Sequence, residues 1–458
     1  MKRVFSIGLC VSLMSALILA AFINLTVSIN HSSAAEKKAG EVKKVYLVYD
    51  IKNIDAKQLA SFKNDDKILS WCQLDNKLII TCADNERPKA PFTVRVVKNL
   101  DIVEKLSEPF LAMRRGSESP LDEYRAEINI LYESGAYTIF QAPMRVINEL
   151  GKFESNHFRL EKFDQNLPLR IDSKHIEIPP VKKSQKSSVV NVDAQRLAGY
   201  IKTLEGFKTR YSYSEGYTKA AEWAADEFKK MGLEVKMHEY SDGGKKQFNV
   251  VAQKSFAAAD KMYIVCGHLD STSPRPQTEA PGADDNASGS AGVLEAANIL
   301  SKTSGVNNFR FVLFAGEEVG LKGSGAYVKD LKASGDILKV LGVVNFDMIG
   351  FDKIPPLSTL FETYETYKGF IANFIEAANA QSDESKRLKI TVSYRPWGSD
   401  HIPFLKAQVP CFLFIEDEFE ANVNYHQTSD KFEFINIELC AEFVRVTASA
   451  LLNITAGN

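Results

Sequence analysis

Two patterns of apolar and polar positions divide the chain. From residue 36 to 178, short alternating or β-branched runs are separated by Asp, Asn, Lys and Pro, which is typical of strands joined by turns. The strands that this pattern predicts cover residues 45–51, 68–72, 78–82 and 92–97. We therefore expect a smaller, strand-rich α+β domain at residues 36–178.

After residue 190 the pattern changes to apolar strands that alternate with amphipathic helices. The predicted strands cover residues 233–238, 248–252, 262–266, 309–314, 340–346 and 411–415. The predicted helices cover residues 193–204, 217–231, 288–300, 320–331, 364–380 and 437–452. This alternation is typical of an α/β domain whose mixed, mostly parallel sheet carries helices on both faces, and we expect that domain at residues 190–458.

A segment with the composition of a linker separates the two regions. Residues 179–189 begin with Pro179-Pro180 and continue with Lys, Ser and Gln, with few apolar side chains. An exposed lysine-rich linker is a favoured site of proteolytic cutting. The N-terminal domain is therefore either a propeptide or a permanent accessory domain, and the sequence leaves both interpretations open.

The first 35 residues have the pattern of a signal peptide. Lys2 and Arg3 precede an apolar run over residues 4–23, and Ser33-Ala34-Ala35 resembles a small-residue cleavage site. The pattern predicts cleavage after Ala35 and export to a secreted or periplasmic location, with no membrane contact afterwards. An uncleaved membrane anchor is the alternative, because the run approaches the roughly 20 residues that span a bilayer.

Composition excludes some classes of protein. A chain of 458 residues with 45% hydrophobic and 25% charged residues is a globular protein, and its net charge of -2 argues against a nucleic-acid-binding surface. Of the six cysteines, Cys10 falls in the predicted signal peptide, and the others lack the paired spacing of a thiolate zinc site. Cys72 and Cys82 flank a predicted hairpin turn, where they either form a disulfide or remain buried thiols.

Side chains that bind metals or move protons gather where predicted strands end. In open α/β sheets, such residues converge beyond the carboxyl ends of the strands. The residues of this kind are His268, Asp270, Asp284, Glu317, Glu318, Asp347 and His426. The isolated histidines His157 and His175 are interpreted as surface or structural residues, and His238 as a surface residue.

Nitrogen and carboxylate ligands without cysteine suit zinc in a catalytic role. Two histidines and three carboxylates suffice for a pair of Zn²⁺ ions if one carboxylate bridges them. Glu317 neighbours a proposed ligand but is not itself needed as one, so it is the candidate general base. Asp270 is placed to fix the imidazole tautomer of His268. Asp285 and Asn286 are interpreted as turn residues.

Five short motifs in a fixed order carry a resemblance to a known family. They are His268-x-Asp270, Gly282-Ala283-Asp284-Asp285-Asn286-Ala287-Ser288-Gly289, Phe314-Ala315-Gly316-Glu317-Glu318, Asn345-x-Asp347-Met348 and His426-x-x-x-Asp430. Residues 190–458 thereby resemble the co-catalytic dizinc aminopeptidase family of the bacterial leucyl aminopeptidase type. The relatives of that family include glutaminyl cyclases and glutamate carboxypeptidases.

The resemblance implies a phosphorylase/hydrolase-like fold and a role for each residue. Asp284 would bridge two Zn²⁺ ions per chain, with His268 and Asp347 completing one site and Glu318 and His426 the other. Glu317 would be the general base, and Asp270 the group that orients His268. The implied function is a metalloprotease, an aminopeptidase that hydrolyses N-terminal residues from peptides with a free N-terminus.

The resemblance has one gap and leaves alternatives. Residues 394–397 do not clearly supply the tyrosine with which some members steady an oxyanion, and Tyr394 and Trp397 are the candidates for that place. A glutaminyl cyclase with one zinc is one alternative function. A carboxypeptidase, which needs a cationic pocket for which Arg395 and Lys353 are available, is a second, and a non-catalytic binding ectodomain is a third. The intact set of ligands favours a working hydrolase. Side-chain preference and oligomeric state stay open.

Overall fold

The computed structural model describes residues 44–89, 94–96, 105–116, 119–155, 157–163, 166–176, 179, 190–351, 356–417 and 421–456. The chain from Lys44 to Asn458 forms one compact unit. The predicted signal peptide and nearly all of the predicted linker lie outside the described residues. Within the described part of the chain, no helix has the length and apolar character needed to cross a membrane.

A mixed sheet of 13 strands forms the centre of the molecule, in the order β10-β11-β13-β12-β14-β17-β15-β16-β9-β2-β3-β1-β4. The C-terminal region of the chain (residues 190–456) contributes eight strands to this sheet. They are β10 (Glu234–Asp242), β11 (Lys245–Lys254), β12 (Met262–His268), β13 (Asn308–Phe314), β14 (Val340–Phe346), β15 (Ser358–Glu362), β16 (Lys389–Ser393) and β17 (Cys411–Glu416). Strands β12, β13, β14 and β17 are mutually parallel, so their carboxyl ends lie at one edge. The predicted mostly parallel α/β fold is confirmed.

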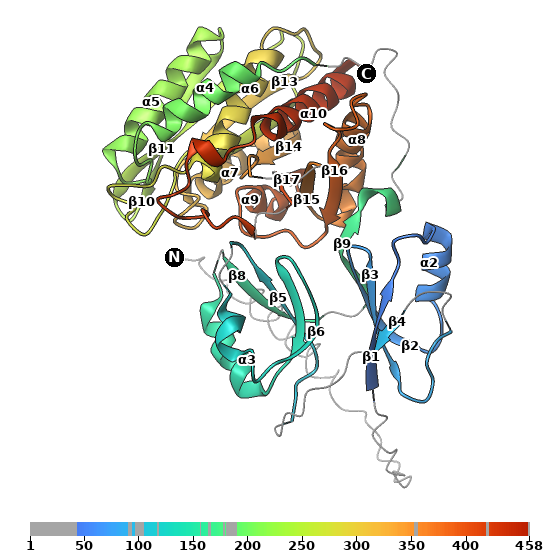
Figure 1. Ribbon diagram of the computed structural model, residues 1–458. Helices are drawn as coiled ribbons and strands as arrows, with labels where there is room; N and C mark the ends of the chain where they lie inside the picture. Colours follow the sequence, from blue (N-terminus) through green and yellow to red (C-terminus); the bar gives the residue numbers. More distant parts are fainter. Residues whose placement is uncertain are drawn as a thin grey trace, which may run out of the picture. The chain divides into compact units, whose positions relative to one another are not determined.

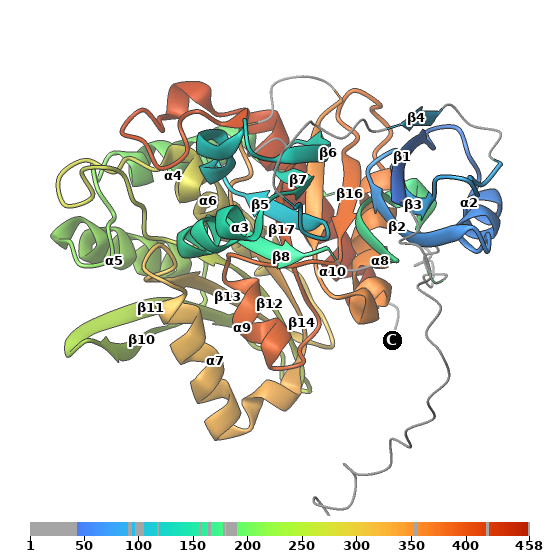
Figure 2. The same cartoon turned by 90° about the horizontal axis from the view of Figure 1, so that it is seen from below.

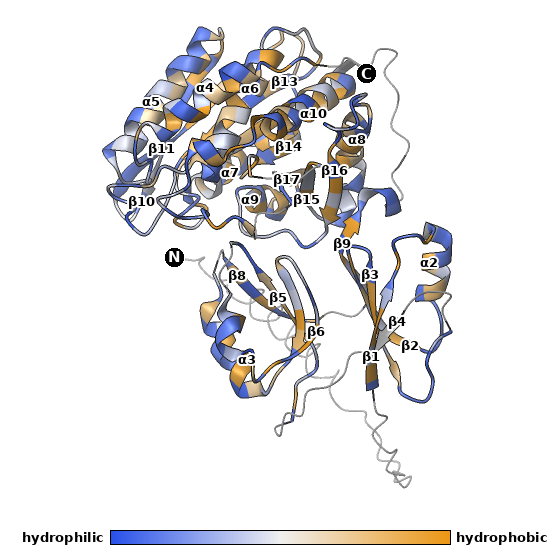
Figure 3. Cartoon of the chain, in the orientation of Figure 1, coloured by the Kyte–Doolittle hydropathy of each residue, from blue (hydrophilic) through white to orange (hydrophobic). Residues whose placement is uncertain are grey.

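Helices cover both faces of this part of the sheet (Figures 1 and 2). One face carries α4 (Ala194–Glu205), α5 (Glu215–Lys230), α6 (Gly289–Leu300), α8 (Lys368–Asn379) and α10 (Ile437–Ala456), and the other carries α7 (Lys322–Ser334) and α9 (His401–Lys406). Alternate side chains of a strand enter different cores: Phe311 and Leu313 of β13 pack on one face, and Val312 and Phe314 on the other. Burial of both faces explains why these strands are continuous apolar runs. In Figure 3 this apolar character is concentrated on the strands.

The N-terminal region (residues 44–176) is strand-rich with short helices, as predicted. Its part of the large sheet consists of β1 (Lys44–Asp50), β2 (Ile68–Leu74), β3 (Lys77–Ala83), β4 (Val94–Val96) and β9 (Leu167–Asp172). A second sheet, in the order β6-β7-β5-β8, consists of β5 (Phe110–Arg114), β6 (Asn129–Ser134), β7 (Tyr137–Gln141) and β8 (Phe158–Lys162). The two α-helices described in this region are α2 (Ala56–Lys63) and α3 (Met144–Leu150).

Strand β9 makes the large sheet continuous between the two regions. It pairs in parallel with β2 and antiparallel with β16. A shared core, which contains Tyr137 and Leu169 from the N-terminal region and Leu360, Trp397 and Leu413 from the C-terminal region, packs against this junction. The two regions therefore share backbone hydrogen bonds as well as side-chain contacts.

Two ion pairs with buried carboxylates also join the regions. Arg170 Nη2 lies 2.8 Å from Asp417 Oδ1, and Arg115 Nη2 lies 3.3 Å from Glu362 Oε2. Replacing either arginine would leave Glu362 or Asp417 buried without its cation, which costs roughly 3–5 kcal/mol.

Cys72 and Cys82 are both free and buried. The hairpin register pairs Cys72 with Ile79 and Ile68 with Cys82, so the two cysteines do not face each other. They also enter different hydrophobic cores. Of the two interpretations of this pair, the structure shows the buried thiols.

Candidate metal centre

The ends of parallel strands bring the candidate residues together. His268 is the last residue of β12, and Asp347 follows β14 directly. After β13, the left-handed backbone of Gly316 (φ 70°) turns the chain into Glu317 and Glu318. His426 comes from the loop between β17 and α10.

The carboxylate of Asp285 lies between the two histidines. Its Oδ1 is 3.1 Å from His268 Nε2, and its Oδ2 is 3.0 Å from His426 Nε2. Each histidine has a further carboxylate on its own side: Asp347 Oδ1 lies 3.2 Å from His268 Nε2, and Glu318 Oε2 lies 3.0 Å from His426 Nε2. The result is two equivalent half-sites that share Asp285, and we call these five residues the carboxylate–histidine cluster.

Asp284, the expected bridge, is not brought into this cluster. Its Oδ1 accepts a hydrogen bond from Gly350 N (2.9 Å), and its Oδ2 accepts one from Asn422 Nδ2 (2.9 Å). The chain leaves the helical conformation at Asp285 (φ -105°, ψ 91°), so the neighbouring carboxylate is the one that reaches the histidines. The interpretation of Asp285 as a turn residue is corrected by this geometry, and the place expected for Asp284 is taken by Asp285.

Asn286 was interpreted as a turn residue, yet it ties the loop to the end of β14. Its Nδ2 donates to Phe346 O (3.0 Å), and its Oδ1 accepts from Met348 N (3.2 Å). On the other side of the loop, the carboxylate of Asp430 accepts hydrogen bonds from the backbone N–H groups of Asp284 and Asp285. These contacts fix the loop backbone that carries the Asp285 side chain.

Other polar groups orient the cluster from behind. His268 Nδ1 lies 3.1 Å from the backbone oxygen of Asp270, which favours the tautomer with Nε2 free to face the cluster. The Asp270 carboxylate also accepts hydrogen bonds from the backbone N–H of Glu317 (3.2 Å) and from Ser212 Oγ (2.7 Å). Ser399 Oγ donates to Asp347 Oδ2 (2.6 Å). Sequence reasoning missed Ser212.

The cluster has an excess of negative charge. Burial, with Glu318 and Asp347 adding to it, raises the pKa of Glu317 well above its ordinary value. Burial and then the charge of Asp285 raise the pKa of Glu318 to about 7. Burial acts to lower the pKa of His426, but Glu318 and Asp285 outweigh it and raise that pKa well above the usual range. Two histidines do not balance four neighbouring carboxylates, so divalent cations would relieve the repulsion.

The donor atoms of the cluster fit zinc. They are imidazole nitrogens and carboxylate oxygens without a thiolate, the set expected for a catalytic zinc site. Ligand atoms of His268, Asp285 and Glu318 all lie within 4.8 Å of one another. Among the described residues, no donor reaches the buried Oε1 of Glu318, which leaves that oxygen available to a metal.

The two aromatic candidates for steadying an oxyanion lie elsewhere. Tyr394 lines a pocket together with Trp71 and His175, and none of the cluster residues lines that pocket. Trp397 is 5% exposed and packs in the shared core. Arg395, a candidate for a carboxypeptidase pocket, lies 3.4 Å from Glu161 of the N-terminal region. Lys353 lies outside the described residues.

Sequence reasoning missed residues of the N-terminal region that reach the cluster. The ring centroid of His157 is 4.7 Å from that of His426, and its Nδ1 is 3.0 Å from Tyr425 Oη. Arg115 is buried and donates to Trp397 O (2.8 Å). An isolated histidine far away along the chain carries no pattern that would reveal such a contact, because only the tertiary fold brings it there.

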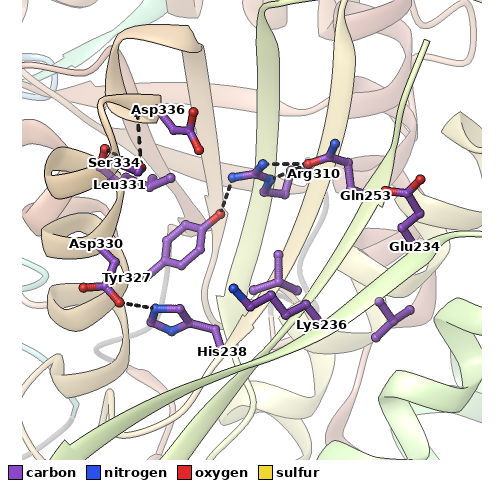
Figure 4. Close-up of a pocket in the computed structure, with 12 residues that line it drawn as sticks. Glu234, Lys236, His238, Gln253, Arg310, Tyr327, Asp330, Leu331, Ser334 and Asp336 are labelled. Carbon is purple, nitrogen blue, oxygen red and sulfur yellow. Dashed lines mark hydrogen bonds and ion pairs between the residues drawn. The ribbon is translucent and has the colours of Figure 1, made fainter. Parts of the chain in front are cut away.

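A separate hollow of about 520 Å³ lies between the β10–β11 hairpin and α7 (Figure 4). Several of its polar side chains are paired with one another: His238 Nε2 lies 3.0 Å from Asp330 Oδ2, and Arg310 donates to Gln253 Oε1 and Tyr327 Oη. No residue of the carboxylate–histidine cluster lines it. His238 is 8% exposed, so it is a buried structural residue and its interpretation as a surface residue was wrong.

The sequence of this chain is similar to a known peptidase family and to several curated proteins. Residues 249–451 match the family model described as Peptidase family M28. The chain is 31% identical over 249 residues to a probable leucine aminopeptidase from Trichophyton verrucosum, which covers 50% of this chain and 59% of that protein. The chain spans between half and three fifths of the length of the first curated relatives that it matches.

Solved structures share the fold at low identity. LapB from Legionella pneumophila aligns with 76% of this chain and 100% of its own, at 17% identity and a TM-score of 0.55. BSAP, a zinc aminopeptidase from Bacillus subtilis, aligns with 58% of this chain and 96% of its own, at 17% identity and a TM-score of 0.50. The share aligned with LapB exceeds what residues 190–458 can supply, so the common fold includes part of the N-terminal region.

Proposed function

We propose that the chain is a zinc-dependent aminopeptidase, since residues 249–451 match the family model described as Peptidase family M28. Its substrates would be peptides with a free N-terminus. The observation that carries the proposal is the shared position of Asp285, with one oxygen toward His268 and the other toward His426. A carboxylate that faces two similar half-sites is the arrangement that a pair of metal ions needs.

Each residue of the cluster has a proposed role. His268 and Asp347 would hold one Zn²⁺, His426 and Glu318 the other, and Asp285 would contribute an oxygen to both. When bound, the two ions supply Lewis acidity, which polarises the scissile carbonyl and makes a water more acidic. The chain must then provide a proton acceptor that is close to the cluster but not one of its ligands.

Glu317 is the residue that fits this need. It is buried, it adjoins Glu318 in the sequence, and it is not one of the five proposed ligands, so its carboxylate is left to accept a proton. In the proposed reaction, Glu317 accepts a proton from the attacking water as the C–O bond forms. It then delivers that proton to the leaving amine as the C–N bond breaks. Asp270 holds the backbone N–H of Glu317 and thereby helps to place this carboxylate.

Charge favours an N-terminal substrate over a C-terminal one. The two described arginines that could receive a terminal carboxylate are engaged, Arg395 with Glu161 and Arg115 with Glu362. An aminopeptidase is therefore the proposal, rather than a carboxypeptidase.

The first test compares leucine anilide with N-acetyl-leucine anilide as substrates of the purified protein. We expect hydrolysis of the free-amine substrate alone, because an aminopeptidase acts on peptides with a free N-terminus. Glu317→Gln should keep its zinc and lower kcat by roughly 10²-fold or more, as expected for loss of a general base. Hydrolysis of both substrates would contradict the aminopeptidase assignment, and loss of zinc in Glu317→Gln would make Glu317 a ligand.

A further inference from the structure

A hollow of about 450 Å³ lies where the two regions of the chain meet, and we call it the junction pocket. The N-terminal region lines it with Lys63 from the end of α2, Trp71 from β2 and His175 after β9, and the C-terminal region lines it with Tyr394 after β16. No residue of the carboxylate–histidine cluster lines it. Its size and its partly apolar lining, which includes Ile171, are typical of a site for a small molecule.

Lys63 brings a positive charge to the junction pocket without an opposite charge beside it. Its Nζ donates to Gln73 Oε1 (2.8 Å) and lies 3.9 Å from the centroid of the Trp71 ring. Among the described residues, no carboxylate forms an ion pair with this lysine. Burial lowers the pKa of Lys63 to about 8, as expected for an ammonium group that has lost water without gaining an anion.

The other two charged side chains of the lining balance each other. Glu365 Oε1 lies 3.7 Å from Lys368 Nζ, and both residues line the pocket. Two lysines and one glutamate leave an excess of one positive charge while His175 is neutral. The junction pocket therefore favours a ligand with a single negative charge.

Two further polar atoms of the lining are buried without a hydrogen-bond partner among the described residues. They are Tyr394 Oη and His175 Nδ1. Buried polar atoms are nearly always satisfied in folded proteins, by the protein itself, by water or by a ligand. The phenol donates one hydrogen, and the imidazole nitrogen donates or accepts according to its tautomer. Both atoms are therefore available to polar groups of a bound molecule.

The apolar part of the lining distinguishes an organic anion from an inorganic one. Trp71, Leu59 and Ile176 line the pocket together with Lys63. Phosphate has no apolar surface to bury against these side chains, and it carries more than one negative charge near neutral pH. A carboxylate on an aromatic or aliphatic body has one charge and also removes apolar surface from water.

We propose that the junction pocket is a second binding site, for a small organic carboxylate with an apolar body, and that Lys63 holds the carboxylate. Trp71 and the aliphatic side chains receive the body of the ligand, and Tyr394 and His175 serve any further polar group that it carries. The site shares no residue with the carboxylate–histidine cluster, so this inference does not rest on the proposed aminopeptidase function.

Fluorine NMR of the zinc-loaded full chain tests this with 4-fluorophenylacetate and its neutral amide, 4-fluorophenylacetamide. The two compounds have the same body and differ in charge. We expect saturable binding of the acid and a Kd for the amide that is roughly 10–100-fold higher, the factor that hydrogen bonds to a charged group provide. Inorganic phosphate should not displace the acid. This comparison needs no variant.

Lys63→Met assigns the binding to the junction pocket, because it removes the charge and keeps a long side chain. In this variant the acid should bind as weakly as the amide. Lys57→Met is the matched control, since Lys57 is an exposed lysine of the same helix that does not line the pocket, and it should leave the Kd unchanged. The zinc content and the thermal midpoint show whether each variant is folded.

Four results would overturn the inference. They are an absence of saturable binding in the wild type, equal Kd values for the acid and the amide, displacement of the acid by phosphate, and an unchanged Kd in folded Lys63→Met. The last result would place the acid at another site, such as the metal centre, where a carboxylate is a natural ligand of zinc.

Discussion

Asp285 is the residue on which the candidate metal centre depends most, because its two oxygens face different histidines. Its neighbour Asp284 has the same side chain and is equally buried, yet it binds Gly350 N and Asn422 Nδ2 instead. Two adjacent carboxylates with different directions provide a comparison in which charge and size are held constant.

Replacing each aspartate by asparagine should separate their roles. We expect Asp285→Asn to bind much less zinc than the wild type, because both half-sites lose a charged ligand. Asp284→Asn should keep its zinc but unfold more easily, by about 1–3 kcal/mol, because its amide has one acceptor oxygen for the two N–H groups of Gly350 and Asn422. Metal analysis of the folded proteins and denaturant unfolding measure the two effects. The reverse result, with zinc lost only in Asp284→Asn, would restore Asp284 as the bridge.

Most residues of the carboxylate–histidine cluster could be predicted from their positions at the ends of predicted strands. His268, Glu318, Asp347 and His426 were expected to converge because parallel strands end at one edge, and the structure brings them together. The choice between Asp284 and Asp285 depends on φ and ψ in a loop, which residue type does not determine. His157 was interpreted as a surface or structural residue, since a single histidine has no periodicity that would place it beside His426.

Among the elements, β9 decides how the N-terminal region relates to the rest of the chain. The central strands and long helices of the C-terminal region were predictable from their apolar runs and periodicity. Strands β15 and β16 and the short helix α9 were not predicted, since five or six residues contain too few repeats to reveal a period. Because β16 is the strand that pairs with β9, missing it concealed the continuity of the sheet.

This continuity predicts that cutting the linker will not release the N-terminal region. A specific protease site inserted between Lys186 and Ser187 should be cut, and the two fragments should still elute together in size-exclusion chromatography without denaturant. The β9 pairing, the shared core and the Arg170–Asp417 and Arg115–Glu362 ion pairs hold them. The uncut protein is the control. Elution of two separate folded fragments would instead favour a removable propeptide.

At the scale of the whole molecule, the candidate metal centre belongs to a fold that spans both regions. Loops at one edge of the large sheet carry the proposed ligands, and the N-terminal region adds His157 next to His426. A ligand that binds only the folded protein also stabilises it, by about 2.7 kcal/mol at a concentration of 100 Kd. Zinc should therefore support both activity and stability.

Zinc titration of the chelator-treated protein tests the central claim most directly. The metal-free protein should not hydrolyse leucine anilide and should have a lower thermal midpoint. Activity should return as zinc is added and level off at about two ions per chain, the number that the two half-sites around Asp285 require. Full activity in protein shown to contain no metal, or a maximum reached with a single bound ion, would contradict the dizinc account.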